Sequence, residues 1–259
     1  MREPASATAL VAARTASVVA VLLGWVTLSW LLYSPRLALF PPPWAVAVRF
    51  GQLARTELGP DVLFSLGEAA GGWVIGSLLG IAIGALVGLV PAARFVLRPV
   101  LDFLRFISPL AWVPLAILWF GIGYWSKASI IALVSFFIVV VNTAHGMAAR
   151  DRDAQKVARA LRLRLPQRAE VVLMSAMPDI LLGLRVALGA AWGGVVLSEL
   201  VAGDVGLGAM ESFGGQSFDV AQIMVGMVVL AVMGYAANLG FVRAQRRLFP
   251  WIRSNRTGR

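Results

Sequence analysis

The chain alternates long apolar runs with short polar segments. Six of the runs come close to the roughly 20 residues that an α-helix needs to cross a bilayer. We therefore expect an all-α integral membrane protein with about six transmembrane helices, forming a single transmembrane domain over residues 1–259. The expected spans cover residues 12–33, 64–90, 97–120, 128–148, 180–202 and 220–242.

The longest polar segment, 150–178, separates the fourth apolar run from the fifth. The spacing of Lys156, Arg159, Leu161 and Leu165 indicates a short surface helix within it. We expect this segment to contact a soluble partner. Its seven basic residues are Arg150, Arg152, Lys156, Arg159, Arg162, Arg164 and Arg168.

Two further polar segments predict local structure. The prolines at 41–43 are expected to prevent helix formation, and residues 45–54 after them to form an amphipathic helix along the membrane surface. Residues 203–219 are rich in glycine and acid. Within them, 206–213 are predicted to form a short turn that dips toward the membrane.

Composition agrees with a membrane protein, and the basic residues predict its orientation. Only 14% of the residues are charged, against about a quarter in soluble domains. The net charge of +10 does not indicate a nucleic-acid partner, because the basic residues lie between apolar runs, where anionic lipid accounts for them better. If successive spans alternate in direction, 18 of the 23 Lys and Arg residues lie on the same side of the membrane as both termini and residues 150–178. We therefore expect that side to be cytoplasmic. The opposite side carries Arg36, Arg49, Arg55 and Lys127.

The second apolar run carries a ridge of glycines at every fourth position: 72, 76, 80, 84 and 88. Small residues along one helix face allow two helix backbones to approach closely in lipid. The ridge predicts close packing against another helix of this chain, or the seam of a homodimer; the first is favoured.

Five ionisable residues lie in or beside the apolar runs, where a charge costs roughly 2.5–3.5 kcal/mol at the bilayer centre. Glu68, Asp102 and Arg105 are expected near helix ends, where the side chain can reach the interface. Arg185 is expected to tether the polar segment or to contact lipid phosphate. Glu199 has two open roles: a hydrogen bond to a neighbouring helix, or a place in a translocation pathway.

The third apolar run is interrupted at Ser108-Pro109 and again at Pro114. Proline removes backbone hydrogen bonds, and such breaks at membrane depth usually line a cavity or pack against protein. The run is thus either a pathway-lining element or a kinked packing helix. The candidate pathway residues are Pro109, Trp112, Trp119, Asn142, Thr143 and Glu199.

The sequence contains no P-loop, zinc-protease, nucleophile-elbow or dinucleotide motif, no cysteine and one histidine. We therefore expect no enzyme activity, no metal site and no cofactor in this chain.

Three stretches, 108–127, 132–147 and 178–203 followed by Gly206-Leu207-Gly208, resemble the permease subunits of ABC importers of the nitrate, sulfonate and taurine type. The resemblance covers the chain from Phe40 to the basic tail. It implies the type I importer permease fold in the bacterial inner membrane, with both termini cytoplasmic. It also implies a homodimer, two cytoplasmic ATPase subunits that bind ATP and Mg²⁺, and a periplasmic substrate-binding protein.

By this resemblance, 150–178 matches the coupling segment that enters a groove of the ATPase. Lys156 stands where the family has an acid and Arg162 where it has a glycine, so the expected groove is more acidic than usual. The expected coupling residues are Lys156, Val157, Ala158, Arg159, Leu161 and Arg162.

The resemblance implies a small anion such as a sulfonate, taurine or nitrate as substrate. A thiamine pyrimidine precursor, riboflavin or an aromatic acid is the alternative by the same mechanism. A different class, an ion-coupled secondary transporter with Glu199 and Asp102 as proton carriers, also stays open.

Overall fold

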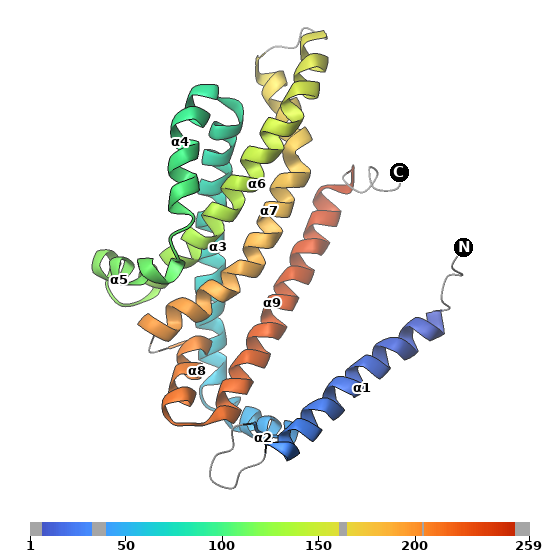
Figure 1. Ribbon diagram of the computed structural model, residues 1–259, viewed down its shortest axis with the longest axis vertical. Coiled ribbons are helices and arrows are strands. Elements are labelled where there is room, and N and C mark those ends of the chain that lie inside the picture. The colour runs from blue at the N-terminus through green and yellow to red at the C-terminus, as the bar shows by residue number, and fades with distance from the viewer. Residues whose placement is uncertain (1–6, 33–39, 161–164, 204, 252–259) are drawn as a thin grey trace. The chain divides into compact units, whose positions relative to one another are not determined.

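The computed structural model describes residues 7–32, 40–160, 165–203 and 205–251, with the backbone alone for some of them, 149–160 included. The described residues are almost entirely helical and contain no strand, which confirms the all-α prediction (Figure 1). The helices are α1 (Ala7–Leu31), α2 (Pro43–Leu53), α3 (Leu58–Leu89), α4 (Pro91–Leu104), α5 (Pro109–Phe120), α6 (Tyr124–Ala160), α7 (Leu165–Ala202), α8 (Leu207–Gln216) and α9 (Val220–Leu248).

The chain divides into two compact units. The first consists of Met1–Gly59 and Met210–Val228, and it holds α1, α2, most of α8 and the start of α9. The second consists of Pro60–Ala209 and Val229–Arg259, and it holds α3 to α7 with the first turn of α8 and the rest of α9. The site described below lies within the second unit.

The predicted count of six spans is not confirmed among the described residues. Four helices are long and apolar enough to cross a membrane, and α4 and α5 qualify only as a pair that is bent by 98°. The apolar part of α1, Thr15–Leu31, is shorter than a span. The four spans are Leu58–Leu89, Tyr124–Ala148, Val171–Val201 and Val220–Leu248.

The break predicted at Ser108-Pro109 is present, whereas the one predicted at Pro114 is not. Ser108 is the N-cap of α5, and Pro109 is its first residue, a position where the missing N–H costs nothing. Pro114 lies inside α5, which continues to Phe120. The third predicted span is therefore two helices that meet at a sharp angle.

Two predictions about local structure are wrong. Pro43 does not prevent a helix but begins α2, because proline suits the first turn, where the backbone N–H has no partner in the helix. The turn predicted at 206–213 is the first part of α8, a helix of 10 residues. The helix predicted at 45–54 is confirmed within the bounds of α2.

The glycine ridge of α3 packs against α6. A Cβ atom built on Gly72 would lie 2.7 Å from the carbonyl oxygen of Ala128, and one on Gly84 would lie 2.8 Å from that of Val140. Gly76, Gly80 and Gly88 likewise face α6, so the contact continues turn by turn along both helices. The intramolecular alternative is confirmed for this face, because α6 occupies the space that a second copy would need.

The predicted coupling segment is largely helical in its backbone. Helix α6 continues past its apolar part, Tyr124–Ala148, to Ala160, and α7 begins at Leu165. The coupling residues at 156–159 therefore lie in the last turns of α6, not in a separate short helix. Leu161 and Arg162 lie outside the described residues.

Candidate functional site

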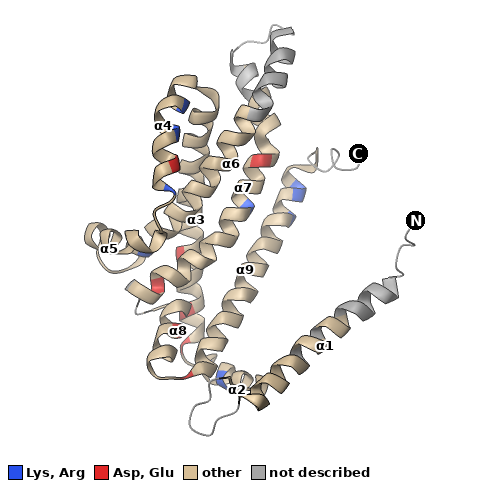
Figure 2. Cartoon of the chain, viewed as in Figure 1, with Lys and Arg blue, Asp and Glu red and all other residues tan. Residues whose placement is uncertain are grey.

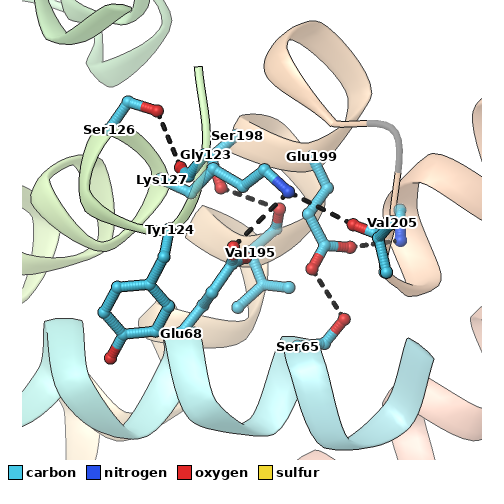
Figure 3. A network of polar contacts seen from close by, with 12 residues as sticks. Ser65, Glu68, Gly123, Tyr124, Ser126, Lys127, Val195, Ser198, Glu199 and Val205 are labelled. Carbon is cyan, nitrogen blue, oxygen red and sulfur yellow. Dashed lines mark hydrogen bonds and ion pairs between the residues drawn. The ribbon is translucent and has the colours of Figure 1, made fainter. Parts of the chain in front are cut away.

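A buried polar network joins α3, α6, α7 and the start of α8 (Figure 3). It stands out because charged residues are otherwise sparse along the described spans (Figure 2). Helix α3 contributes Asp61, Ser65 and Glu68, whose spacing of four and three residues puts them on one helix face. The same face continues into the glycines that begin at Gly72.

Glu199, in the last turn of α7, is at the centre of the network. Its Oε1 atom accepts a hydrogen bond of 2.6 Å from the hydroxyl of Ser65. Its Oε2 atom accepts one of 2.6 Å from the backbone N–H of Gly208. The side chain is 0% exposed, so both bonds are made without competition from water.

Three successive backbone N–H groups at the start of α8 donate to side chains of other helices. Gly206 donates to Asp61 Oδ1 at 3.0 Å, Leu207 donates to Ser65 Oγ at 3.0 Å, and Gly208 donates to Glu199 as described. The first N–H groups of a helix have no partner within it, and they favour negatively charged acceptors. Residues of α3 and α7 thus cap α8 and fix where it begins.

Gly206 is required by this arrangement for two reasons. Its φ angle is +121°, in the region that favours glycine. A Cβ atom there would also overlap the carboxylate of Glu199. The glycine therefore lets the backbone pass directly against the buried acid.

Lys127, in the first turn of α6, is the cation of the network. Its Nζ atom lies 3.4 Å from Glu68 Oε1 and donates a hydrogen bond of 3.2 Å to the carbonyl oxygen of Val205. It also lies 4.6 Å from the centre of the Phe64 ring. The side chains of Lys127 and Glu68 are 2% and 0% exposed, and no hydrogen bond to either carboxylate oxygen of Glu68 is present in the described structure. Coulombic attraction to Lys127 is therefore the main stabilising contact of Glu68.

Comparison with known proteins identifies the class of this chain. The family described as "binding-protein-dependent transport system inner membrane component" matches residues 76–254. The chain belongs to this family. The match includes Lys127, Glu199 and the start of α8, whereas the residues that α3 contributes to the network precede it.

Three relatives show how similar the chain is to transport permeases. The aliphatic sulfonates transport permease protein SsuC of Bacillus subtilis is 37% identical over 217 residues, which are 83% of this chain and 78% of the relative. The taurine transport system permease protein TauC of Escherichia coli is 36% identical over 67% of this chain and 64% of the relative. The bicarbonate transport system permease protein CmpB of Synechocystis is 31% identical over 73% and 69%.

The chain is therefore an ABC importer permease subunit and a multi-pass protein of the inner membrane, as the resemblance implied. The match also decides between the two transporter classes, in favour of the ABC importer and against the ion-coupled secondary transporter. The relatives are transport subunits, which agrees with the expectation of a protein that is not itself an enzyme.

The permease structure corrects two expectations about ionisable residues. Glu68 does not reach the interface from a helix end but is fully buried against Lys127. Lys127 is not an outer-loop charge, because it is buried in the first turn of α6. The Nε atom of Arg185 donates a hydrogen bond of 2.9 Å to Asn238 of α9, and its expected tether or lipid contact stays a prediction.

Two other expectations about these residues are confirmed. Asp102 and Arg105 lie at the C-terminal end of α4 and form an ion pair of 3.4 Å. Glu199 does hydrogen-bond a neighbouring helix, which is one of its two open roles. Its place in a pathway stays a prediction.

The candidate pathway residues lie in different surroundings. Trp112 packs with Val113 and Ala116 of α5 on Ile130 of α6, whereas Trp119 is 62% exposed. Pro109 begins α5.

The remaining pathway candidates on α6 are held by neighbouring helices. The amide of Asn142 donates to the carbonyl oxygen of Ile138, and its Cβ packs against Gly183 of α7. Thr143 is fully buried against Gly84 of α3. Because Thr143 follows Lys127 by 16 residues on α6, it lies roughly 24 Å along the helix from the buried network.

Proposed function

We propose that this permease imports a small oxyanion, a sulfonate, taurine or a nitrate-like anion, delivered by a periplasmic binding protein and driven by ATP. The family match over residues 76–254 carries the proposal. It is supported by the names of the relatives, which refer to aliphatic sulfonates, taurine and bicarbonate. All three are small molecules with a negatively charged oxygen group.

In the proposed assembly, two copies of the permease join two cytoplasmic ATPase subunits. ATP and Mg²⁺ bind to the ATPase subunits, and this chain holds no cofactor. Closure of the ATPase pair moves the segment 150–178 of each permease and switches the pathway between inward-open and outward-open states. The helical backbone of α6 and α7 beyond their apolar parts supports this mechanism, because a continuous helix transmits a displacement of its end to the span.

The proposed pathway is lined by Pro109, Trp112, Trp119 and Asn142. The indole N–H of Trp112 supports it, since this buried donor has no acceptor within the described structure. Thr143 and Glu199 are fully buried, so they line the pathway only in a state where neighbouring helices separate.

Charge reversal in the coupling segment tests the proposed contact with the ATPase. We expect Lys156→Glu and Arg159→Glu to reduce co-purification of the ATPase subunit at least fivefold, because the expected groove is acidic. Arg243→Glu, at an exposed position near the end of α9, is the matched control and should leave co-purification unchanged. Equal recovery of the ATPase with all three variants would show that these residues do not dock it.

A ligand screen on the partner binding protein tests the substrate class. We expect sulfonates, taurine or nitrate to raise its melting temperature, and ATP-dependent uptake into proteoliposomes to follow the same ligand. Stabilisation by pyrimidines or aromatic acids alone would contradict the oxyanion proposal while leaving the importer class intact.

A further inference from the structure

A basic cavity of about 250 Å³ lies between α3, α4 and α6. Arg94, Arg98, Asp102 and Arg105 of α4 line one side of it, and His145 of α6 lines another. The remaining wall is apolar and includes Val140 of α6. The cavity therefore combines a charged side with an apolar side.

The arginines share one face of α4, because their positions differ by four and seven residues. The single aspartate of the lining has its Oδ2 atom 3.7 Å from Arg98 Nε and its Oδ1 atom 3.4 Å from Arg105 Nε. Both distances exceed the 2.7–2.9 Å that is usual for a charge-assisted hydrogen bond. The lining thus holds three guanidinium groups and one carboxylate, and the cavity keeps a surplus of positive charge.

Arg94 is hydrogen-bonded to backbone groups of α3, so Arg98 and Arg105 are the arginines of the cavity that a ligand can use. Its Nε atom donates a hydrogen bond of 3.1 Å to the carbonyl oxygen of Val87, and its Nη2 atom donates to that of Gly88. These carbonyl groups belong to the last turn of α3, where the helix offers them no N–H partner. Arg94 therefore anchors α4 to the end of α3.

The side chains of Arg98 and Arg105 are 69% and 38% exposed, and their ion pairs use only one of the five N–H donors of each guanidinium.

The rest of α4 is suited to lipid. Phe95 is 85% exposed and Phe103 is 71% exposed, and both lie off the arginine face. The cavity lies at the end of α3 and beside Ala148, where the apolar part of α6 also ends. Lipid headgroups lie at the ends of membrane spans, and basic pockets between helices there bind anionic headgroups.

We propose that this cavity binds the phosphodiester group of an anionic phospholipid through Arg98 and Arg105. The planar guanidinium forms paired hydrogen bonds to phosphate oxygens, and the apolar wall at Val140 accommodates the start of an acyl chain. The same chemistry would bind a free oxyanion, phosphate or sulfonate. The exposed phenylalanines favour the lipid, since a free anion gains nothing from them. The site is separate from the buried network, and the proposal does not depend on the transported substrate.

Lipid retention by the full-length permease tests the proposal. The protein is purified with the wild-type sequence, with Arg98→Gln plus Arg105→Gln, and with the control Arg243→Gln. Native mass spectrometry then measures bound phosphatidylglycerol and phosphatidylcholine after reconstitution with equal amounts of both. We expect the wild type and the control to retain phosphatidylglycerol selectively, and the double variant to retain at least fivefold less.

Two further measurements distinguish the sources of the anion and check the fold. Arg98→Lys plus Arg105→Lys keeps the charge and should restore part of the retention, and the melting temperature of each variant shows that it is folded. Equal retention by the glutamine variant, or equal binding of phosphatidylcholine, would overturn the proposal. Displacement of phosphatidylglycerol by millimolar inorganic phosphate or methanesulfonate would also overturn it, in favour of a free-oxyanion site.

Discussion

The two halves of α3 join this helix to its neighbours in different ways along one face. From Gly72 to Gly88, glycines bring the backbone of α3 against that of α6. From Asp61 to Glu68, acidic and hydroxyl side chains bond to α6, α7 and the start of α8. The glycine half depends on the absence of side chains, whereas the polar half depends on particular atoms from four segments. The glycine half therefore fixes the distance between α3 and α6, and the polar half fixes where α8 begins.

The largest effect is expected from a side chain placed in the glycine half. In Gly76→Val, the new Cβ atom would overlap the backbone of Ala132, which no rotamer change can relieve. The cost should exceed the roughly 1–3 kcal/mol of ordinary overpacking, and we expect little folded protein. Size-exclusion chromatography of the membrane extract measures the folded fraction.

Gly240→Val in α9 is the matched control, because nothing lies within 4 Å of a Cβ atom at that position. It carries the same loss of helix propensity without the contact. If both variants behave alike, close approach to α6 is not what the glycine ridge contributes.

A smaller loss is expected from removal of the cation in the polar half. Lys127→Met keeps the length of the side chain but leaves Glu68 buried without its partner. Breaking a buried ion pair from one side costs about 3–5 kcal/mol. For a protein of this size we expect the melting temperature in detergent to fall by about 10 °C.

The double variant Lys127→Met plus Glu68→Gln tests whether the pair itself is responsible. Removing both charges should recover much of the melting temperature, since a neutral pair of similar volume avoids the cost of an uncompensated charge. If the double variant instead loses as much as the single variants Lys127→Met and Glu68→Gln lose together, the two side chains are not directly coupled.

A third effect, smaller again, is expected from Glu199→Gln. The amide oxygen can still accept from Gly208 and the amide nitrogen can donate to Ser65 Oγ, but the Ser65 hydroxyl then loses the acceptor of its own hydrogen. One unsatisfied buried donor costs about 1–3 kcal/mol. Thermal unfolding should show the loss, while Glu57→Gln, the same change at an exposed position, should show none. An unchanged melting temperature for Glu199→Gln would mean that α8 is not held by this carboxylate.

The glycine half was predictable from the sequence, and the polar half largely was not. Five glycines at one spacing lie within a single segment, so their pattern is visible without knowledge of the partner helix. Glu68 and Lys127 come from separate runs, and the sequence of each run alone places them in reach of the interface. The hydrogen bond of Glu199 to a neighbouring helix was one of two alternatives, since a buried acid requires a partner but the sequence does not name it. The role of Asp61 could not be predicted, because its hydrogen-bond donor is the backbone N–H of Gly206, which is distant in the sequence.

The smallest effect is expected from a solvent-exposed polar contact in the same compact unit. Arg185 bonds to Asn238 of α9, but its side chain is exposed. Exposed polar and ionic contacts contribute at most about 1 kcal/mol, so Arg185→Gln and Asn238→Ala should each lower the melting temperature by no more than about 3 °C. A double-mutant cycle on the two residues should give a coupling energy well below that of Glu68 and Lys127. If the two couplings prove equal, burial does not explain the strength of the polar half, and its role in holding α8 would have to come from geometry alone.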